Sequence, residues 1–242
     1  MKNVKLEILV LGSGAGDSAV YNALPSSSFM LLVDGEPFCL VDLGLGVGQQ
    51  VLANFGGFPG RVIITHNHSD HAGELPVVLR VEQAQGRKIE VISHNEVAKR
   101  LKQHRIAEHL QSISAEELAD WKSPQTAETV ELDYGLEIVF YPGHHSEFSC
   151  GFMISRNGTP LLAYSGDTSL EPELYDRLDR AEVFIMDARP KPNQWHAGFE
   201  EVLPWLGCGR YILGHGLNEP QVKESKLNGL PLLWKGDRIV LS

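Results

Sequence analysis

The sequence has 242 residues, 43% of them hydrophobic, and its 31 acidic residues outnumber 21 basic ones to give a formal net charge of −10. Such a chain can bury a sizeable core, and it has no apolar run near the roughly 18 residues that a membrane span needs. Affinity for polyanions comes from Lys and Arg that neutralise phosphates, so the acidic balance disfavours a large nucleic-acid footprint.

In the first half of the chain, strand-like runs alternate with helical patterns. Asp34-Gly35 is a strong hairpin signal between two strand-like runs. Ser114-Ala-Glu-Glu117 has the pattern of a capping box and predicts the start of a helix. Strands are expected at 5–11, 28–33, 37–42, 61–65 and 89–93, and helices at 46–55, 73–85, 95–109 and after Ser114.

The second half is similar, with a predicted hairpin over 128–141 and a turn at Asn157-Gly158. Further strands are expected at 150–155, 160–165, 183–187 and 211–214, and helices near 171–178 and from Phe199. Clustered strands with helices between them suit two sheets packed face to face with helices outside. We therefore predict one α/β domain over residues 1–242, a four-layer αββα sandwich of two mixed sheets whose pseudo-symmetric halves meet near residue 125.

A glycine-rich turn, Leu11-Gly-Ser-Gly-Ala-Gly16, follows the first predicted strand and invites comparison with dinucleotide-binding motifs. That fingerprint requires its third glycine where Asp17 stands, followed by a helix. Residues 18–28 contain Pro25 followed by three serines and show no apolar periodicity, so we expect no helix and no dinucleotide site. The glycines are expected to let the backbone approach a substrate.

The densest group of ligand-type side chains is His66-Asn-His-Ser-Asp-His71, directly after the β-branched run at 61–65. Neutral imidazole and carboxylate are ligands that suit zinc and similar divalent ions. A chain that leaves a strand in a tight loop can turn alternate side chains toward one point. The sequence therefore predicts a metal site here rather than a solvated polar loop.

The motif His-x-His-x-Asp-His after a strand resembles the signature of the metallo-β-lactamase superfamily, whose members hold one or two metals between two stacked sheets. Three later segments agree with this resemblance because each follows a strand-like run: Tyr141-Pro-Gly-His-His145, Tyr164-Ser-Gly-Asp167 and Leu213-Gly-His215. The resemblance covers nearly the whole chain. It implies a first metal held by His66, His68 and one of His144 or His145, a second held by Asp70, His71 and His215, and a bridging Asp167.

The choice between His144 and His145 depends on the branch of the superfamily. In the tRNase Z and phosphoribosyl cyclic phosphodiesterase branches, the ligand histidine stands six residues before a glycine that opens the next strand, as His145 does before Gly151. Glyoxalase II-like members have Pro-Gly-His instead, which selects His144. We favour His145, with the other histidine as a neighbour of the ligands or a substrate contact.

The resemblance implies two divalent ions per chain. Zinc is the favoured metal, with manganese or iron as alternatives. Two such ions ~3.5–4 Å apart can share a hydroxide generated near neutral pH and stabilise the oxygens of an in-line displacement. Asp70 is expected to take part in this reaction as well as in metal binding. Asp42 is expected to brace the metal loop, residues 66–71. Hydrolysis is thus the expected activity, and a non-catalytic metal-binding protein or a two-iron redox protein is the rival class.

His196 bears on which class of substrate the enzyme would hydrolyse. The segment 196–215 resembles the stretch of tRNase Z-like phosphodiesterases in which a histidine starts a helix ahead of the last metal ligand and acts as a general acid or phosphate contact. The plainer alternative is an exposed histidine at a helix N-terminus.

The remaining aromatic and imidazole side chains have simpler expected roles. Trp195 is expected to line the wall of the pocket. A solvated helix face is expected to carry His94, His104 and His109 with the basic residues Lys99, Arg100, Lys102 and Arg105.

True tRNase Z features are missing, because no basic Pro-x-Lys-x-Arg loop follows Gly16 and no long Gly/Pro-rich arm occurs between residues 140 and 215. We therefore expect a phosphodiesterase for a small or cyclic anionic substrate, with no tight nucleic-acid binding and no membrane association. Hydrolysis of a carboxyl ester, lactone or thioester is the alternative, and tRNA 3′ processing is disfavoured. The sequence leaves open whether the protein forms a homodimer.

Three cysteines, Cys39, Cys150 and Cys208, are too few and too scattered for a disulfide framework. Glu7 stands where a signal peptide would have its apolar centre, so we expect no cleaved leader. A reducing cytoplasmic location is the resulting expectation.

Overall fold

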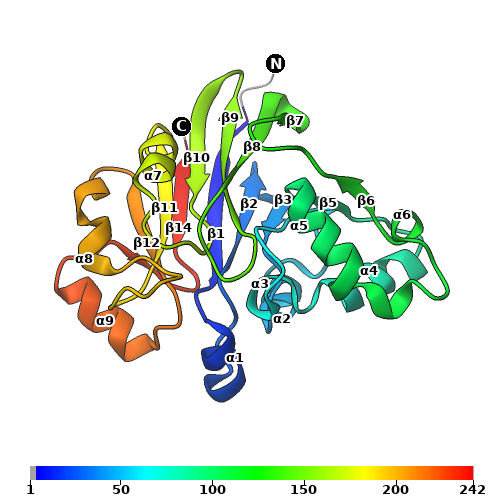
Figure 1. The fold of residues 1–242 in the computed structure, drawn as a ribbon, viewed down its shortest axis with the longest axis horizontal. Helices are drawn as coiled ribbons and strands as arrows, with labels where there is room; N and C mark the ends of the chain where they lie inside the picture. Colours follow the sequence, from blue (N-terminus) through cyan, green and yellow to red (C-terminus); the bar gives the residue numbers. More distant parts are fainter. Residues whose placement is uncertain (1–3, 242) are drawn as a thin grey trace.

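A computed structural model describes residues 4–241 and shows two seven-stranded sheets packed face to face between helices (Figure 1). Across the first sheet, the strands are β14 (Arg238–Leu241), β1 (Leu6–Gly12), β2 (Ser28–Val33), β3 (Glu36–Val41), β4 (Arg61–Ile63), β5 (Glu90–Ile92) and β6 (Asp120–Lys122). Across the second, they are β13 (Leu232–Leu233), β12 (Arg210–Gly214), β11 (Val183–Ala188), β10 (Thr159–Tyr164), β9 (Cys150–Arg156), β8 (Leu136–Pro142) and β7 (Thr129–Glu131). The predicted αββα sandwich is confirmed.

The helices lie outside the sheets. The first half contributes α1 (Gly16–Asn22), α2 (Val47–Phe55), α3 (Ser69–Ala72), α4 (Leu75–Ala84), α5 (Asn95–Arg100), a π-helix η1 (Leu101–Arg105), a 3₁₀-helix η2 (Ala107–His109) and α6 (Ala115–Leu118). The second contributes η3 (Asp133–Gly135), α7 (Pro172–Leu178), α8 (Phe199–Val202), η4 (Leu203–Trp205) and α9 (Glu219–Leu227). Within residues 4–241, no helix is long and apolar enough to cross a membrane.

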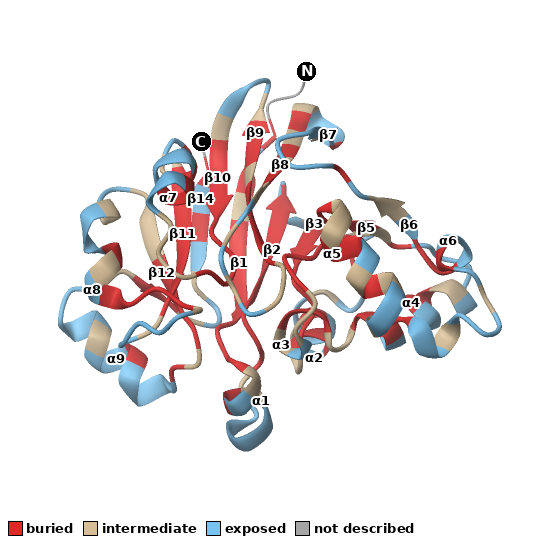
Figure 2. Cartoon of the chain, viewed as in Figure 1, coloured by how far each residue is buried: buried red, intermediate tan, exposed pale blue. Residues whose placement is uncertain are grey.

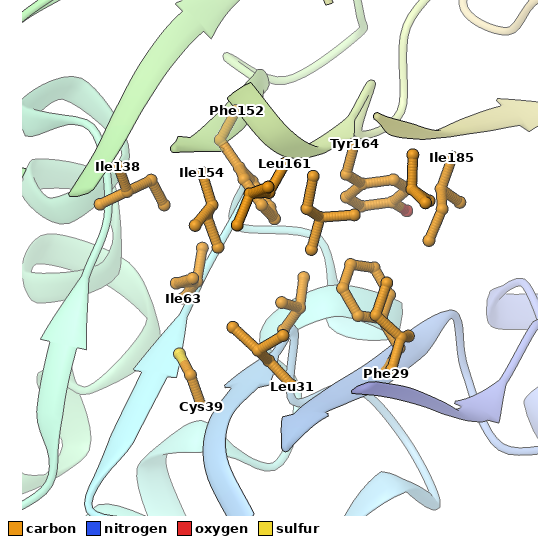
Figure 3. Packing of buried hydrophobic residues seen from close by; sticks show 14 of the residues in the cluster. Phe29, Leu31, Cys39, Ile63, Ile138, Phe152, Ile154, Leu161, Tyr164 and Ile185 are labelled. Carbon is orange, nitrogen blue, oxygen red and sulfur yellow. The ribbon is translucent and has the colours of Figure 1, made fainter. Parts of the chain in front are cut away.

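The core between the sheets is made of apolar side chains from both inner faces (Figure 3). Phe29 on β2 meets Tyr164 on β10 edge to face, with ring centroids 5.4 Å apart. Two further apolar clusters fill the space between each sheet and its outer helices. As a result, the central strands are largely buried, whereas the edge strands β6, β7 and β14 and most helices keep exposed residues (Figure 2).

Both sheets are mixed, as predicted. In the first, β1 to β3 pair antiparallel and β3 to β6 pair parallel. In the second, β10 to β13 pair parallel, and β9 runs antiparallel to both β8 and β10. The strands β8, β10, β11 and β12 therefore all end at the same edge of the second sheet, and ligand sites of α/β proteins usually lie at such carboxyl ends.

Local turn chemistry agrees with the sequence. Positive φ angles occur at both Asp34 and Gly35, and again at Asn157 and Gly158, as type I′ hairpin turns require. In the predicted capping box, Glu117 N donates to the Ser114 hydroxyl (3.2 Å) and Ser114 N donates to the Glu117 carboxylate (2.9 Å).

Several elements differ from the prediction. A helix, α1, does follow the glycine-rich turn, and it projects from the sandwich with Val20 and Tyr21 exposed (Figure 1). It buries no apolar stripe, so periodicity could not reveal it. The predicted helix over 95–109 is divided into α5, η1 and η2, and the elements β6, β13, β14 and α9 were not predicted. That the whole chain forms one domain stays a prediction.

Candidate metal centre

The His66–His71 segment follows β4 and includes the first three residues of the short helix α3. His66 and His71 are fully buried, and His68 precedes the first helical residue with an extended backbone. This change from strand to helix turns the side chains of the loop toward the carboxyl edge of the second sheet. The loops after β8, β10 and β12 bring His145, Asp167 and His215 to the same place.

Three imidazoles converge on one side of the centre. Nδ1 of His68 lies 3.1 Å from Nε2 of His66 and 3.1 Å from Nε2 of His145. Burial lowers the pKa of all three rings, and that of His66 falls well below its ordinary value. The rings are therefore neutral at physiological pH, which is the form that binds metal.

A second group lies beside it. Asp70, His71 and His215 place one ligand atom each within 4.8 Å of one another. Nε2 of His215 is 3.7 Å from Oδ2 of Asp70, and the rings of His71 and His215 are stacked with centroids 5.9 Å apart. Gly16 N, from the glycine-rich turn, donates to the same Asp70 oxygen at 3.0 Å.

Asp167 lies between the two groups. Its Oδ2 atom is 3.9 Å from Nε2 of both His66 and His145, and its Oδ1 atom is 3.3 Å from Nε2 of His71 and 3.7 Å from Nδ1 of His215. Burial by itself would raise the pKa of Asp167, but the adjacent His215 and His71 hold it well below the ordinary value. Each carboxylate oxygen thus faces one group.

The donor atoms fit a cation better than they fit one another. Nε2 of His71 and Oδ1 of Asp167 are buried but form no hydrogen bond of acceptable geometry within the described residues. Leaving such an atom unpaired costs on the order of 1–3 kcal/mol. Divalent ions bound between the two groups would satisfy both atoms, so the residues present suit a metal centre.

Asp42 holds His71 from behind. Nδ1 of His71 donates to Oδ2 of Asp42 at 2.8 Å, which directs Nε2 toward Asp167. Thr65 donates to the same carboxylate through its backbone N and its hydroxyl, both at 2.8 Å. Burial raises the pKa of Asp42; burial would lower that of His71, but Asp167 and Asp42 raise it well above its ordinary value. The expected bracing contact is therefore present.

The two adjacent histidines differ sharply. Nδ1 of His145 donates to the carbonyl of Trp195 at 3.0 Å, leaving Nε2 to face His68. His144 instead has a side chain 58% exposed, with Nδ1 3.0 Å from the Ser169 hydroxyl. Its ring lies against that of half-buried Trp195, with centroids 5.4 Å apart. The structure therefore brings His145 into the group and leaves His144 at its rim.

His196 is buried, which makes the exposed-histidine alternative wrong. Its Nδ1 atom is 3.0 Å from Oδ2 of Asp187, and its ring centroid is 4.9 Å from those of His145 and His215. It precedes α8 by three residues rather than beginning the helix.

Sequence reasoning missed Asp187, which contacts two site histidines. Its Oδ1 atom is 3.2 Å from Nδ1 of His215, while Oδ2 pairs with His196. Burial and the nearby Asp167 would raise the pKa of Asp187, but His215 and His196 outweigh them and lower it. The available signal was an acid near the carboxyl end of the apolar strand at 183–188, much as Asp167 follows the carboxyl end of β10.

The predicted solvated face is partly wrong. His104 is exposed and His109 half-buried, but His94 is buried. His94 caps α5 by accepting from Glu96 N at 3.3 Å and lies 3.0 Å from the Thr126 hydroxyl. Arg105 also turns inward, toward the metal loop. Side-chain packing against Phe148, invisible in the local pattern, decides the position of His94.

Comparison with known proteins agrees with this geometry. The family model described as anti-Pycsar protein Apyc1 matches residues 6–206. A protein of Azorhizobium caulinodans described as a metal-dependent hydrolase is 28% identical over 120 residues, which are 45% of this chain and 45% of that protein. A ribonuclease Z of Methanococcus maripaludis is 31% identical over 161 residues, which are 65% of this chain and 51% of that protein.

The chain thus spans about half the length of the curated relatives that it matches. Among solved structures, the metallo-β-lactamase fold protein YhfI of Bacillus subtilis superposes with a TM-score of 0.72 at 15% identity, covering 97% of this chain and 99% of that one. The predicted metallo-β-lactamase fold is confirmed. The relatives include a ribonuclease Z and a metal-dependent hydrolase, in agreement with the predicted branch and enzyme class.

Proposed function

The chain belongs to the anti-Pycsar protein Apyc1 family, and on that premise we propose that it is a metal-dependent hydrolase that cleaves the phosphodiester bond of a small or cyclic substrate. The observation that carries the proposal is the position of Asp167, whose two oxygens face two different groups of ligand-type side chains. A merely structural ion would need one closed group of four ligands.

The first ion would be held by His66, His68 and His145, the second by Asp70, His71 and His215, and both by Asp167. Zinc suits this set of imidazoles and carboxylates, and manganese or iron is the alternative. Two divalent ions bound there supply Lewis acidity and activate water at neutral pH.

The chain's own residues would orient the reactants. Asp42 fixes the ring of His71, and the Trp195 carbonyl fixes that of His145. Asp187 holds Nδ1 of His196, so the other nitrogen of that ring remains available to a substrate. We assign His196 the protonation of the leaving oxygen or a contact to the developing charge on the phosphoryl group.

The phosphodiester class is supported by His196 and by similarity to a protein described as a ribonuclease Z. Small substrates are supported by the charge of the chain, since 21 basic residues face 31 acidic ones. A long polyanion would be repelled by this balance, whereas a small anion needs only the local positive charge of the bound ions.

Turnover on a substrate panel tests the proposal. Metal-replete protein would be assayed on an activated phosphodiester, a cyclic nucleotide, a lactone and a thioester, with the His215→Ala variant as the control for contaminating hydrolases. We expect hydrolysis of the phosphodiesters, and loss of that activity in the variant. Faster turnover of the lactone or thioester than of either phosphodiester would contradict the proposal and favour carboxyl-ester chemistry.

A further inference from the structure

Arg105 contacts the metal loop without belonging to the ligand set. It ends the π-helix η1 and lies 36 to 38 positions away from the loop residues that it contacts. Its Nε donates to the side-chain oxygen of Asn67 (3.1 Å), one terminal nitrogen donates to the Asn67 carbonyl (2.5 Å), and the other donates to the Ser69 hydroxyl (3.3 Å). One guanidinium thus makes three hydrogen bonds to a single short loop.

The residues that it holds alternate with the ligand-type residues. Asn67 separates His66 from His68, and Ser69 separates His68 from Asp70. The ligand-type side chains face the centre, while Asn67 and Ser69 offer oxygens to the guanidinium. A planar fork with several donors suits this task better than a single ammonium group would.

The π-helix helps to explain why Arg105 reaches the loop. Ile106 N donates to the carbonyl of Leu101, five residues earlier, at 3.0 Å. One extra residue in a turn rotates the later residues of the helix by roughly 100° relative to a regular α-helix. Leu101 and Ile106 are fully buried on either side of the turn, so the core fixes its position.

Arg105 is half-buried and, among residues 4–241, is held by hydrogen bonds rather than by an ion pair. Arg61, Arg100 and Arg210, which are also half-buried, each form an ion pair with a carboxylate. Arg105 instead donates to Asn67 and Ser69. Burial lowers its pKa, and the nearby carboxylate of Asp70 opposes that shift. The guanidinium is therefore committed to the loop that carries the ligand-type residues.

We propose that Arg105 is a positioning residue of the metal centre, which holds the loop so that His66, His68 and Asp70 present their ligand atoms together. The inference rests on the proposed function only in requiring that the centre bind metal. It makes no assumption about the substrate.

The test is zinc affinity, measured on metal-free protein by competition with a chromophoric chelator. Arg105→Met keeps the apolar stem and removes all donors, and contacts that support ligands are typically worth 10–100-fold in metal affinity. We expect a loss of that size for at least one ion, with turnover restored by saturating zinc. Arg80→Met is the matched control, because Arg80 is exposed and donates to Gln83, also on α4, away from the metal centre.

Two further variants keep the test decisive if Arg105→Met folds poorly. Arg105→Lys retains the charge and should lose zinc affinity as well, because one ammonium cannot reach three acceptors. Ser69→Ala combined with Arg105→Lys should cost less than the sum of the single changes, since both remove the same contact.

The outcomes separate clearly. Unchanged zinc affinity with a raised KM in Arg105→Met would overturn the proposal and make Arg105 a substrate contact. An equal loss of affinity in Arg80→Met would overturn it as a general charge effect. Normal zinc binding by the wild type without phosphodiester turnover would contradict the proposed function and leave the role of Arg105 intact.

Discussion

Oδ2 of Asp187 lies 3.0 Å from Nδ1 of His196, and both side chains are buried. An imidazole whose Nδ1 donates to a carboxylate has one tautomer and one orientation, with Nε2 directed away from the acid. The same carboxylate reaches His215 with its other oxygen, 3.2 Å from Nδ1. The residue proposed to act on the substrate and a proposed metal ligand are therefore oriented by one acid.

Replacement of His196 should affect turnover and leave the metal in place. We expect His196→Ala to lower kcat by ~10²–10⁴-fold with unchanged metal content, because its role lies in proton transfer or charge stabilisation. A nitrophenolate leaving group, which needs no proton, should rescue the variant if His196 is a general acid. His215→Ala is the comparison and should lose metal with activity. Wild-type rates from His196→Ala on every phosphodiester would refute its role.

Replacement of Asp187 should act through both histidines. Asp187→Asn keeps the size of the side chain but removes its charge, so we predict lower zinc affinity and a lower kcat. Because Asp187 and His196 act as a unit, the double variant with His196→Ala should lose less kcat than the product of the two single losses. Steady-state kinetics at saturating zinc would measure this coupling, and independent, multiplicative losses would count against the shared role.

Binding to tRNA should be weak. The net charge of −10 gives little counterion release, so we expect affinity no better than the non-specific range of ~10⁻⁴–10⁻⁶ M at physiological salt. Gel-shift titration at two salt concentrations measures this. A tight, salt-resistant complex with precursor tRNA, together with cleavage at its 3′ end, would overturn the small-substrate assignment.

The three cysteines should differ in reactivity. Cys208 is exposed, whereas Cys39 and Cys150 are buried, and burial raises the pKa of Cys39 to about 12 and also raises that of Cys150. Both buried groups therefore stay as unreactive thiols at moderately alkaline pH. Titration with Ellman's reagent at pH 8.5 should modify one thiol in the native protein and three after unfolding. Rapid modification of two or more native thiols would contradict the packing of the core.

The sequence predicted those features that depend on local chemistry. His66 to His71 have ligand-type side chains at short spacing, and the turn at Asp34-Gly35 needs only two residues with positive φ. Features that depend on distant contacts were missed. The strand β14 exists because the end of the chain pairs with β1, from Leu6↔Leu241 to Leu9↔Arg238, and no local pattern indicates such a partner.

The same distinction applies within the site. Asp187 resembles any acid near the end of a strand until the fold places His196 and His215 beside it. The run of basic and imidazole side chains around residues 95–109 predicts a solvated face for Arg105. The π-helix and the buried neighbours of Arg105 turn it toward the metal loop instead, and both arise from tertiary packing.

Metal content tests the central claim most directly. Elemental analysis of purified, metal-replete protein should give about two divalent ions per chain, because two groups of ligands share Asp167. Asp167→Ala should retain at most one ion, since the shared carboxylate contributes to both positions. One ion or none in the metal-replete wild type would contradict a dinuclear centre, and with it the two-ion chemistry proposed for this chain.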